Sequence, residues 1–282
     1  MCLAEERSMR YVRAGLCAGL LTSAALMAVA MPAAAEEWSK TYSIAGKPDL
    51  HVETTEANIH VSTWDRNEIE AKVQADGYKI GGGGIRIDER QNGSEVDLEV
   101  HFPREHGIII NFGNHGWHRV DVNIHMPREG QVNLHTGDGE IDVSQFKGEM
   151  QLRSSDGSQE LTGVDGKLVA VAGDGHIRAK GRFDDLELKT GDGRIDATAN
   201  SGSKLMAPWR IETGDGGVNL EIPEALAADV DLHTGDGHID LDVPVVVTVG
   251  RIREHDIQGK INGGGNLLII HTGDGSIRLR RG

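Results

Sequence analysis

The stretch Thr190-Gly191-Asp192-Gly193-Arg194-Ile195 contains the tripeptide that decides the fold, Gly-Asp-Gly. This tripeptide recurs through the second half of the chain, and one Ser-Asp-Gly copy fills a gap in the series. The aspartates of the copies are Asp138, Asp156, Asp174, Asp192, Asp215, Asp236 and Asp274. Successive aspartates lie 18, 18, 18, 23, 21 and 38 residues apart, and the last interval is close to two periods. Self-similarity at a period near 20 residues indicates a solenoid of stacked repeats.

Hydrophobic positions recur at fixed distances from each aspartate. Positions six and four before it and five after it are apolar in every copy, as Leu186, Leu188 and Ala197 show for Asp192. The position three after it is apolar except at Gln159. The two groups have opposite parity, so each copy is predicted to form two strands joined by a bend. Copies stacked at the strand spacing of about 4.8 Å pair their backbone groups with the copies above and below.

We therefore predict an all-β chain folded as a parallel β-solenoid with rungs of about 18–23 residues. Right-handed winding, a right-handed β-helix, is favoured by the general preference for right-handed crossovers.

The corner of each rung is expected to lie at the tripeptide. Glycine tolerates the positive φ that such a corner is expected to need. The predicted structural turn residues are Gly137, Gly139, Gly173, Gly175, Gly191, Gly193, Gly214, Gly216, Gly235, Gly237, Gly273 and Gly275. Two positions before the aspartate stands a Thr or Ser in every copy except that of Ala172. By parity this hydroxyl faces inward and bonds to the corner, which argues against an ice-binding face.

Residues 1–35 are predicted to be a signal peptide. Arg7, Arg10 and Arg13 precede an uncharged, mostly apolar run over residues 14–30, and Ala33-Ala34-Ala35 supplies the small residues of a cleavage site after Ala35. An uncleaved anchor is the alternative, because the apolar run approaches spanning length. No later apolar run approaches about 18 residues, so no transmembrane segment is expected after cleavage. The protein is therefore expected to be exported to the periplasm, the cell surface or the medium.

Composition narrows the classes of partner and of chemistry. The chain has 29 Lys and Arg against 44 Asp and Glu, and its formal net charge of −15 disfavours nucleic acid as a partner. Cys2 and Cys17, the two cysteines of the chain, lie in the predicted signal peptide. The mature chain is therefore expected to have no disulfide, no thiolate metal site and no cysteine nucleophile.

The mature chain divides by its use of the tripeptide. Residues 129–282 carry the Gly-Asp-Gly repeat, and residues 36–128 lack it. Alternating segments at 51–53, 58–61, 68–73, 85–87 and 95–100 nevertheless predict strands, so residues 36–128 are interpreted as an irregular N-terminal β section of the same solenoid. The repeat lapses between residues 251 and 265, where Gly263-Gly264-Gly265 suggests a loop inserted before the last rung.

The sequence resembles a known bacterial family. Asn58-Ile59-His60-Val61, Trp64-Asp65, Met126-Pro127 and the repeated Thr-Gly-Asp-Gly-x-Ile are similar to the "putative adhesin" family of β-strand repeats, also called domain of unknown function 4097. The ending, from Gly259 to Gly265 and from His271 to Ile277, fits the closing pattern of that family. The resemblance implies an extracytoplasmic β-repeat protein and supplies no catalytic residues.

The aspartates of the seven corners allow two interpretations. In register, they line one edge, where Ca²⁺ could bridge carboxylate oxygens. Alternatively, each carboxylate accepts hydrogen bonds from nearby backbone N–H groups and holds the corner as an Asx-turn. The nine-residue calcium-binding repeat is absent, which favours the structural interpretation, and no other cofactor is indicated.

Other polar positions are interpreted as surface. His115, His118 and His125 lie near one another in sequence, and His135, His233 and His271 share an outward column, but neither spacing is a known zinc motif. The column four after the aspartate mixes signs and predicts lateral pairing. Trp64 and Trp117 are candidates for a sugar platform. The carboxylate pair Asp184-Asp185 has no catalytic signature.

No catalytic motif of a familiar hydrolase or nucleotide enzyme is present. We therefore expect a non-catalytic, adhesin-like binding or scaffold protein that contacts an unknown envelope or extracellular component. Two alternatives stay open: a polysaccharide-active β-helix enzyme and a calcium-stabilised secreted repeat protein.

Overall fold

The computed structural model describes residues 35–103, 118–246 and 252–282. The predicted signal peptide, up to residue 34, lies outside these ranges, as does Trp117. Within them every regular element is a β-strand, and no helix is long and apolar enough to cross a membrane. The described strands belong to the compact unit Ala34–Gly282.

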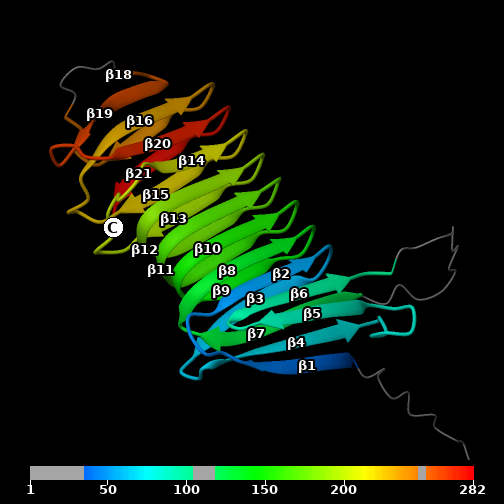
Figure 1. Cartoon of the computed structure of the whole chain (residues 1–282). Coiled ribbons are helices and arrows are strands. Elements are labelled where there is room, and N and C mark those ends of the chain that lie inside the picture. Colours follow the sequence, from blue (N-terminus) through cyan, green and yellow to red (C-terminus); the bar gives the residue numbers. More distant parts are fainter. Residues whose placement is uncertain (1–34, 104–117, 247–251) are drawn as a thin grey trace, which may run out of the picture. The chain divides into compact units, whose positions relative to one another are not determined.

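Each rung consists of one strand before a corner and one strand after it, and the rungs stack into two hydrogen-bonded faces (Figure 1). We call these faces the pre-corner sheet and the post-corner sheet. In spatial order the pre-corner sheet contains β5 (Arg86–Asn92), β6 (Glu95–His101), β2 (Asp49–Thr54), β8 (Glu129–Thr136), β10 (Lys147–Ser154), the later parts of β11 (Gln159–Ala172) and β12 (Ile177–Thr190), β14 (Trp209–Thr213), β20 (Leu267–Thr272), β16 (Ala228–Thr234), β19 (Asp256–Ile261) and β18 (Ile252–Arg253).

The post-corner sheet runs alongside. In spatial order it contains β1 (Glu36–Ser43), β4 (Glu68–Asp76), β7 (Arg119–Pro127), β3 (Asn58–Trp64), β9 (Ile141–Ser144), the first parts of β11 and β12, β13 (Ile195–Ala199), β15 (Val218–Ile222), β21 (Ile277–Arg281) and β17 (Ile239–Asp242). Strands β11 and β12 are each 14 residues long and pass from the post-corner sheet into the pre-corner sheet, which joins the 21 strands of the described ranges into one network.

The prediction of a purely parallel stack is wrong at both ends, and the sheet is mixed. The rungs from β6/β7 to β16/β17 pair in parallel, whereas β1, β4 and β5 at one end and β18 and β19 at the other pair antiparallel. A stack of parallel rungs leaves unpaired backbone groups at its ends, and antiparallel strands occupy those positions here. The fold is all-β and solenoid-like; its predicted handedness stays a prediction.

The order of the last rungs also differs from the prediction. The C-terminal rung β20/β21 lies between β14/β15 and β16/β17, with Trp209 paired to Leu268 and Leu268 to Val230. The interval of 38 residues between Asp236 and Asp274 therefore does not correspond to two successive rungs. The segment between residues 251 and 265, where the repeat is absent, is not a simple loop either. Within it, residues 252–261 form the antiparallel pair β18 and β19, which extends the pre-corner sheet beside β16.

The inward columns are confirmed as the core. The residues six and four before each aspartate are at most 4% exposed, including Trp209, which packs edge-on against Phe183 with ring centroids 6.3 Å apart. The exceptions after the corner are Ile239 and Leu241, which are only partly buried because β17 is the last strand of its sheet. Gln159, the polar exception, is buried and donates through Nε2 to Ser154 Oγ at 2.9 Å.

The glycines at the corners are needed for a reason other than the predicted one. None of the predicted turn glycines has a positive φ. An added Cβ would instead collide with the corner of the neighbouring rung: at Gly193 it would meet the carbonyl of Gly175, with the carbonyl carbon at 2.7 Å. Backbone hydrogen bonds connect the same corners, such as Gly214 N–H to Gly191 O at 2.6 Å. Close stacking, rather than left-handed backbone, excludes a side chain here.

The hydroxyl column behaves as predicted. Thr213 and Thr272 are buried, and Thr213 Oγ1 donates to Gly193 O at 3.0 Å, while Thr272 Oγ1 donates to Gly216 O at 2.9 Å. These two hydroxyls therefore each connect one rung to the corner of a neighbouring rung, and their burial argues against an ice-binding face.

Candidate functional site

The edge formed by the corners carries the seven predicted aspartates. All of them are exposed, and the rung order places Asp274 between Asp215 and Asp236. Within the described ranges none of these carboxylates accepts a hydrogen bond, so the corners are held by the threonine hydroxyls and not by the expected Asx-turns. Two described groups of His, Asp and Glu are close enough to share a metal ion, and neither includes a corner aspartate. Calcium binding there stays a prediction.

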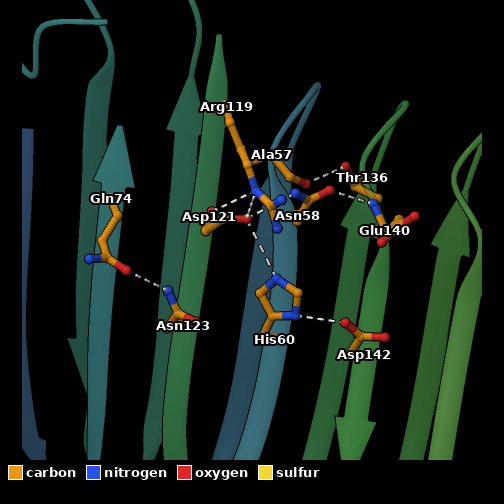
Figure 2. Close-up of polar contacts among 10 residues, drawn as sticks. All are labelled: Ala57, Asn58, His60, Gln74, Arg119, Asp121, Asn123, Thr136, Glu140 and Asp142. Carbon is orange, nitrogen blue, oxygen red and sulfur yellow. Dashed lines mark hydrogen bonds and ion pairs between the residues drawn. The ribbon is translucent and has the colours of Figure 1, made fainter. Parts of the chain in front are cut away.

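A second candidate lies on the outer surface of the post-corner sheet, where β3 runs between β7 and β9 (Figure 2). Strand alternation turns His60 outward between two carboxylates. Its Nδ1 lies 2.7 Å from Asp142 Oδ2, and its Nε2 lies 3.5 Å from Asp121 Oδ1. The hydrogen bond to Asp142 and the charges of both carboxylates raise the pKa of His60 in spite of partial burial. The imidazole of His60 thus connects β3 to β9 through Asp142 and to β7 through Asp121.

Asp121 also accepts hydrogen bonds from two other side chains. Arg119 Nε donates to Asp121 Oδ2 at 2.9 Å, and Asn58 Nδ2 donates to Oδ1 at 2.9 Å. Burial alone raises the pKa of Asp121, but the hydrogen bonds from Asn58 and Arg119 and the charges of Arg119 and His60 outweigh it and lower the pKa. The amide of Asn58 accepts from Glu140 N–H at 3.0 Å. Asn58, His60 and Asp121 are therefore each engaged with neighbouring residues.

Sequence reasoning missed His60 because its rung lacks the tripeptide. The signal was present in the register: Ile59 pairs with Ile141 and His60 with Asp142, so His60 belongs to the outward column four after the corner. The lateral pairing predicted for this column is confirmed: Arg178 Nη1 lies 3.5 Å from Glu160 Oε2, and Asn219 Nδ2 donates to Asp196 Oδ1 at 2.6 Å.

The carboxylate pair Asp184-Asp185 is engaged in ion pairs in β12. Arg182 donates from Nη1 to Asp184 Oδ1 at 2.6 Å and from Nε to Asp165 Oδ1 at 2.8 Å. The hydrogen bonds from Arg182 lower the pKa of Asp184. Asp185 lies 3.5 Å from Lys167 Nζ. This network bridges adjacent rungs, and it gives these carboxylates a structural role.

The structure places the predicted histidines and tryptophan as follows. His233 and His271 are directly paired neighbours with ring centroids 5.8 Å apart, because β20 is inserted beside β16. His125 stacks on Trp64 with centroids 5.5 Å apart, and Arg66 lies over the Trp64 ring at 4.7 Å. Its faces are therefore engaged by protein groups, which disfavours a sugar platform. His118 packs edge-on against Tyr78.

Two other groups have the composition of a metal site. They are His51, Glu95 and Asp97, and Asp88, Glu99 and His101. Both lie on the outer surface of the pre-corner sheet, on β2, β5 and β6, within the section that lacks the tripeptide. Neither was singled out from the sequence, because the residues of each group come together only through strand pairing.

The family model for Toastrack DUF4097 matches residues 49–280. The chain belongs to the Toastrack DUF4097 family. This match covers the described rungs from β2/β3 to β20/β21 and confirms the resemblance found in the sequence. A search of curated proteins finds no match.

Three solved structures are similar to this Toastrack chain. They are a "putative cell adhesion protein" from Clostridium sporogenes (14% identity, TM-score 0.40, 88% of this chain and 100% of that chain), a "putative adhesin" from Bacteroides fragilis (12%, 0.33, 86% and 97%) and a "putative lipid binding protein" from Parabacteroides distasonis (12%, 0.34, 86% and 96%). At this identity and TM-score the likeness says nothing of what the present chain binds.

Proposed function

We propose that this Toastrack protein is exported and acts at the cell envelope as a non-catalytic binding or scaffold protein. The observation that carries the proposal is the register of the rungs. Equivalent residues of successive rungs are direct partners, as in Met150 with Val132 on one side and Leu168 on the other, so outward side chains form long rows in fixed register. Such a repetitive surface suits an extended partner better than a small substrate.

The contacts of the outward ionisable side chains support the same proposal. His60 with Asp142 and Arg182 with Asp165 are connected across rungs at hydrogen-bond distance. Such groups act first as connections between strands. The corner edge, in contrast, presents exposed carboxylates without a hydrogen bond within the described ranges, which makes it a surface for a partner that carries cationic or hydrogen-bond-donating groups.

Fractionation of cells that produce the full chain with a C-terminal tag tests export. We expect a mature protein that begins at Glu36 and is recovered in periplasmic or envelope fractions, and a matched chain without residues 1–35 that stays in the cytoplasm. Cross-linking and pull-down from the envelope then identify the partner. Recovery of the full chain uncleaved in the cytoplasm, or no association with envelope material, would contradict the proposal.

The two alternatives are distinguished by separate measurements. Turnover of acidic glycans by the purified protein would favour the polysaccharide-active enzyme. A thermal melt with Ca²⁺ and with chelator addresses the calcium-stabilised repeat, because a bound cation raises the melting temperature by linkage. We expect neither turnover nor a calcium-dependent rise in the melting temperature.

A further inference from the structure

The antiparallel pair β5 and β6 places four chemically active side chains together on the outer surface of the pre-corner sheet. Arg86 is the cross-strand partner of His101, and Asp88 is the partner of Glu99. Residues two apart on a strand share a face, so the four side chains form one square. Asp88 and Glu99 are about half exposed, with 51% and 53% of their side-chain surface accessible.

The ring nitrogen Nε2 of His101 is the unusual atom of this square. Asp88 Oδ2 and Glu99 Oε2 each lie 3.2 Å from it. The atom is nevertheless shielded from water, and it makes no hydrogen bond to any described residue. The three side chains each offer one ligand atom, and these atoms lie close enough together to share a metal ion.

The distances fit a tetrahedral metal centre. Zinc binds imidazole nitrogen at about 2.0–2.1 Å and carboxylate oxygen at about 2.0–2.2 Å, so two of its ligand atoms are about 3.2–3.5 Å apart. One nitrogen and two carboxylate oxygens favour zinc and its transition-metal neighbours over Ca²⁺ and Mg²⁺, which take oxygen ligands. We propose that Asp88, Glu99 and His101 bind one divalent transition-metal ion of the zinc class.

Arg86 is the competitor that such an ion must displace. Its Nε lies 3.0 Å from Asp88 Oδ2, the same oxygen that faces His101, and its side chain is 69% exposed. An ion pair of an exposed guanidinium contributes little, so Arg86 can give up this contact at small cost. Replacement of Arg86 by a neutral residue removes both the competition for the carboxylate and the repulsion of the metal, so it should tighten binding.

The second group on the same sheet provides an internal comparison. Asp97 Oδ2 accepts hydrogen bonds from Arg90 Nε at 2.9 Å and from Arg90 Nη2 at 2.6 Å. Nε2 of His51 lies 3.1 Å from Asp49 Oδ1, and unlike Nε2 of His101 it is not a buried atom without a hydrogen bond. There the guanidinium already occupies the carboxylate with two donors. The ion is therefore assigned to His101 and not to His51.

A hollow of about 1000 Å³ adjoins the proposed site. Arg86, His101 and Phe102 line part of it, and Gly81–Gly84 line another part. Three protein ligands leave a fourth position of a tetrahedral ion open for water or for a donor group of a partner.

Calorimetric titration of the metal-free, purified protein with ZnCl₂ at pH 7.5 tests the proposal. We expect one site that His101→Ala weakens at least tenfold, that Glu99→Gln also weakens, and that Arg86→Gln tightens several-fold. His51→Ala is the matched control and should leave this site unchanged. Circular dichroism and melting of the metal-free variants should match the original protein, because all these side chains lie on the outer surface.

Three results would overturn the assignment. They are no zinc binding tighter than about 1 mM, equal binding by the original protein and His101→Ala, and loss of binding in His51→Ala alone. Titration with CaCl₂ separates the proposal from the calcium alternative, because Ca²⁺ binding that survives His101→Ala, without zinc binding, would also overturn it. The absorption spectrum of the Co²⁺-loaded protein supplies an independent readout: we expect the intense bands of four-coordinate cobalt, and their absence with Co²⁺ bound refutes the geometry.

Discussion

Two adjacent glycines in one corner allow a direct test of why the corners contain glycine. Gly216 and Gly217 lie between β14 and β15, and neither has a positive φ. A Cβ added at Gly216 would collide with the carbonyl oxygen of Gly193 in the next rung, and it would lie 2.6 Å from the carbonyl carbon and 2.9 Å from Thr213 Oγ1. A Cβ added at Gly217 meets only the carbonyl oxygen of Ser276, at 3.3 Å. Gly216→Ala and Gly217→Ala add the same methyl group, so a difference in stability between them reports on the contacts that this group makes.

The magnitude follows from those contacts. Overpacking at Gly216 costs about 1–3 kcal/mol. Separation of the two rungs also lengthens the hydrogen bond from Thr213 Oγ1 to Gly193 O, now 3.0 Å, which adds about 0.5–1.5 kcal/mol. Alanine in place of glycine also lowers the conformational entropy of the unfolded chain, which stabilises the folded state by about 0.4–1 kcal/mol. With the middle of each range, the net loss for Gly216→Ala is about 2 kcal/mol, or about 4–8 °C in melting temperature. Gly217→Ala should stay within about 1 kcal/mol of the original protein.

Urea unfolding followed by tryptophan fluorescence measures the difference. Trp209 is fully buried on β14, the strand that leads into this corner, so its emission reports on the rung that is perturbed. The midpoint should fall for Gly216→Ala and change little for Gly217→Ala. If Gly216→Ala is as stable as the original protein, or if both variants lose the same stability, close stacking of the corners is not the reason for glycine at this position.

Three further predictions concern single side chains. Ile195→Asp places a carboxylate in the fully buried core and should cost at least about 4 kcal/mol, measured by urea unfolding; an unchanged midpoint would refute the inward assignment. Thr213→Val keeps the shape but leaves the carbonyl of Gly193 without its buried donor and should cost about 1–2 kcal/mol, with Thr213→Ser as the milder control. Because Asp142 raises the pKa of His60, the stability that protonated His60 contributes is fully present below about pH 6.5 and is lost as the pH rises through the raised pKa. His60→Gln should therefore lower the melting temperature more at about pH 5.5 than at about pH 8.5. An equal difference at both pH values would contradict this.

The core could be predicted from the sequence because each rung repeats the same pattern of inward apolar positions. Apolar positions such as Leu188 and Ile195 recur at fixed distances from the corner, and parity alone assigns them to the interior. The inward hydroxyls, such as that of Thr213, follow from the same parity. Parity does not explain why the corners contain glycine. A side chain at Gly193 would collide with the carbonyl of Gly175, which belongs to another rung and lies 18 residues earlier in the chain.

The order of the rungs and the outer polar clusters could not be predicted in this way. Strand β20 has the same inward pattern as any other rung, so the pattern fits equally well after β16 or between β14 and β16. The choice depends on the antiparallel strand β19, which already pairs with one edge of β16. The neighbours of His60 and His101 likewise depend on pairings between distant strands, so their clusters appear only when the register is known.

The distribution of the tripeptide along the chain follows from corner stacking. The corner between β2 and β3 has Ala57 at the position that Gly139 occupies in the next rung, since Ile59 pairs with Ile141. On the other side of this corner lies the rung β6/β7, whose connection between Phe102 and His118 contains no Gly-Asp-Gly. The side chain of Ala57 is accommodated at this corner and is fully buried. From Gly139 onward each such glycine faces another corner at the distance where a Cβ collides. The tripeptide therefore marks the places where one corner rests on another, and the antiparallel strands at the two ends of the stack have no need of it.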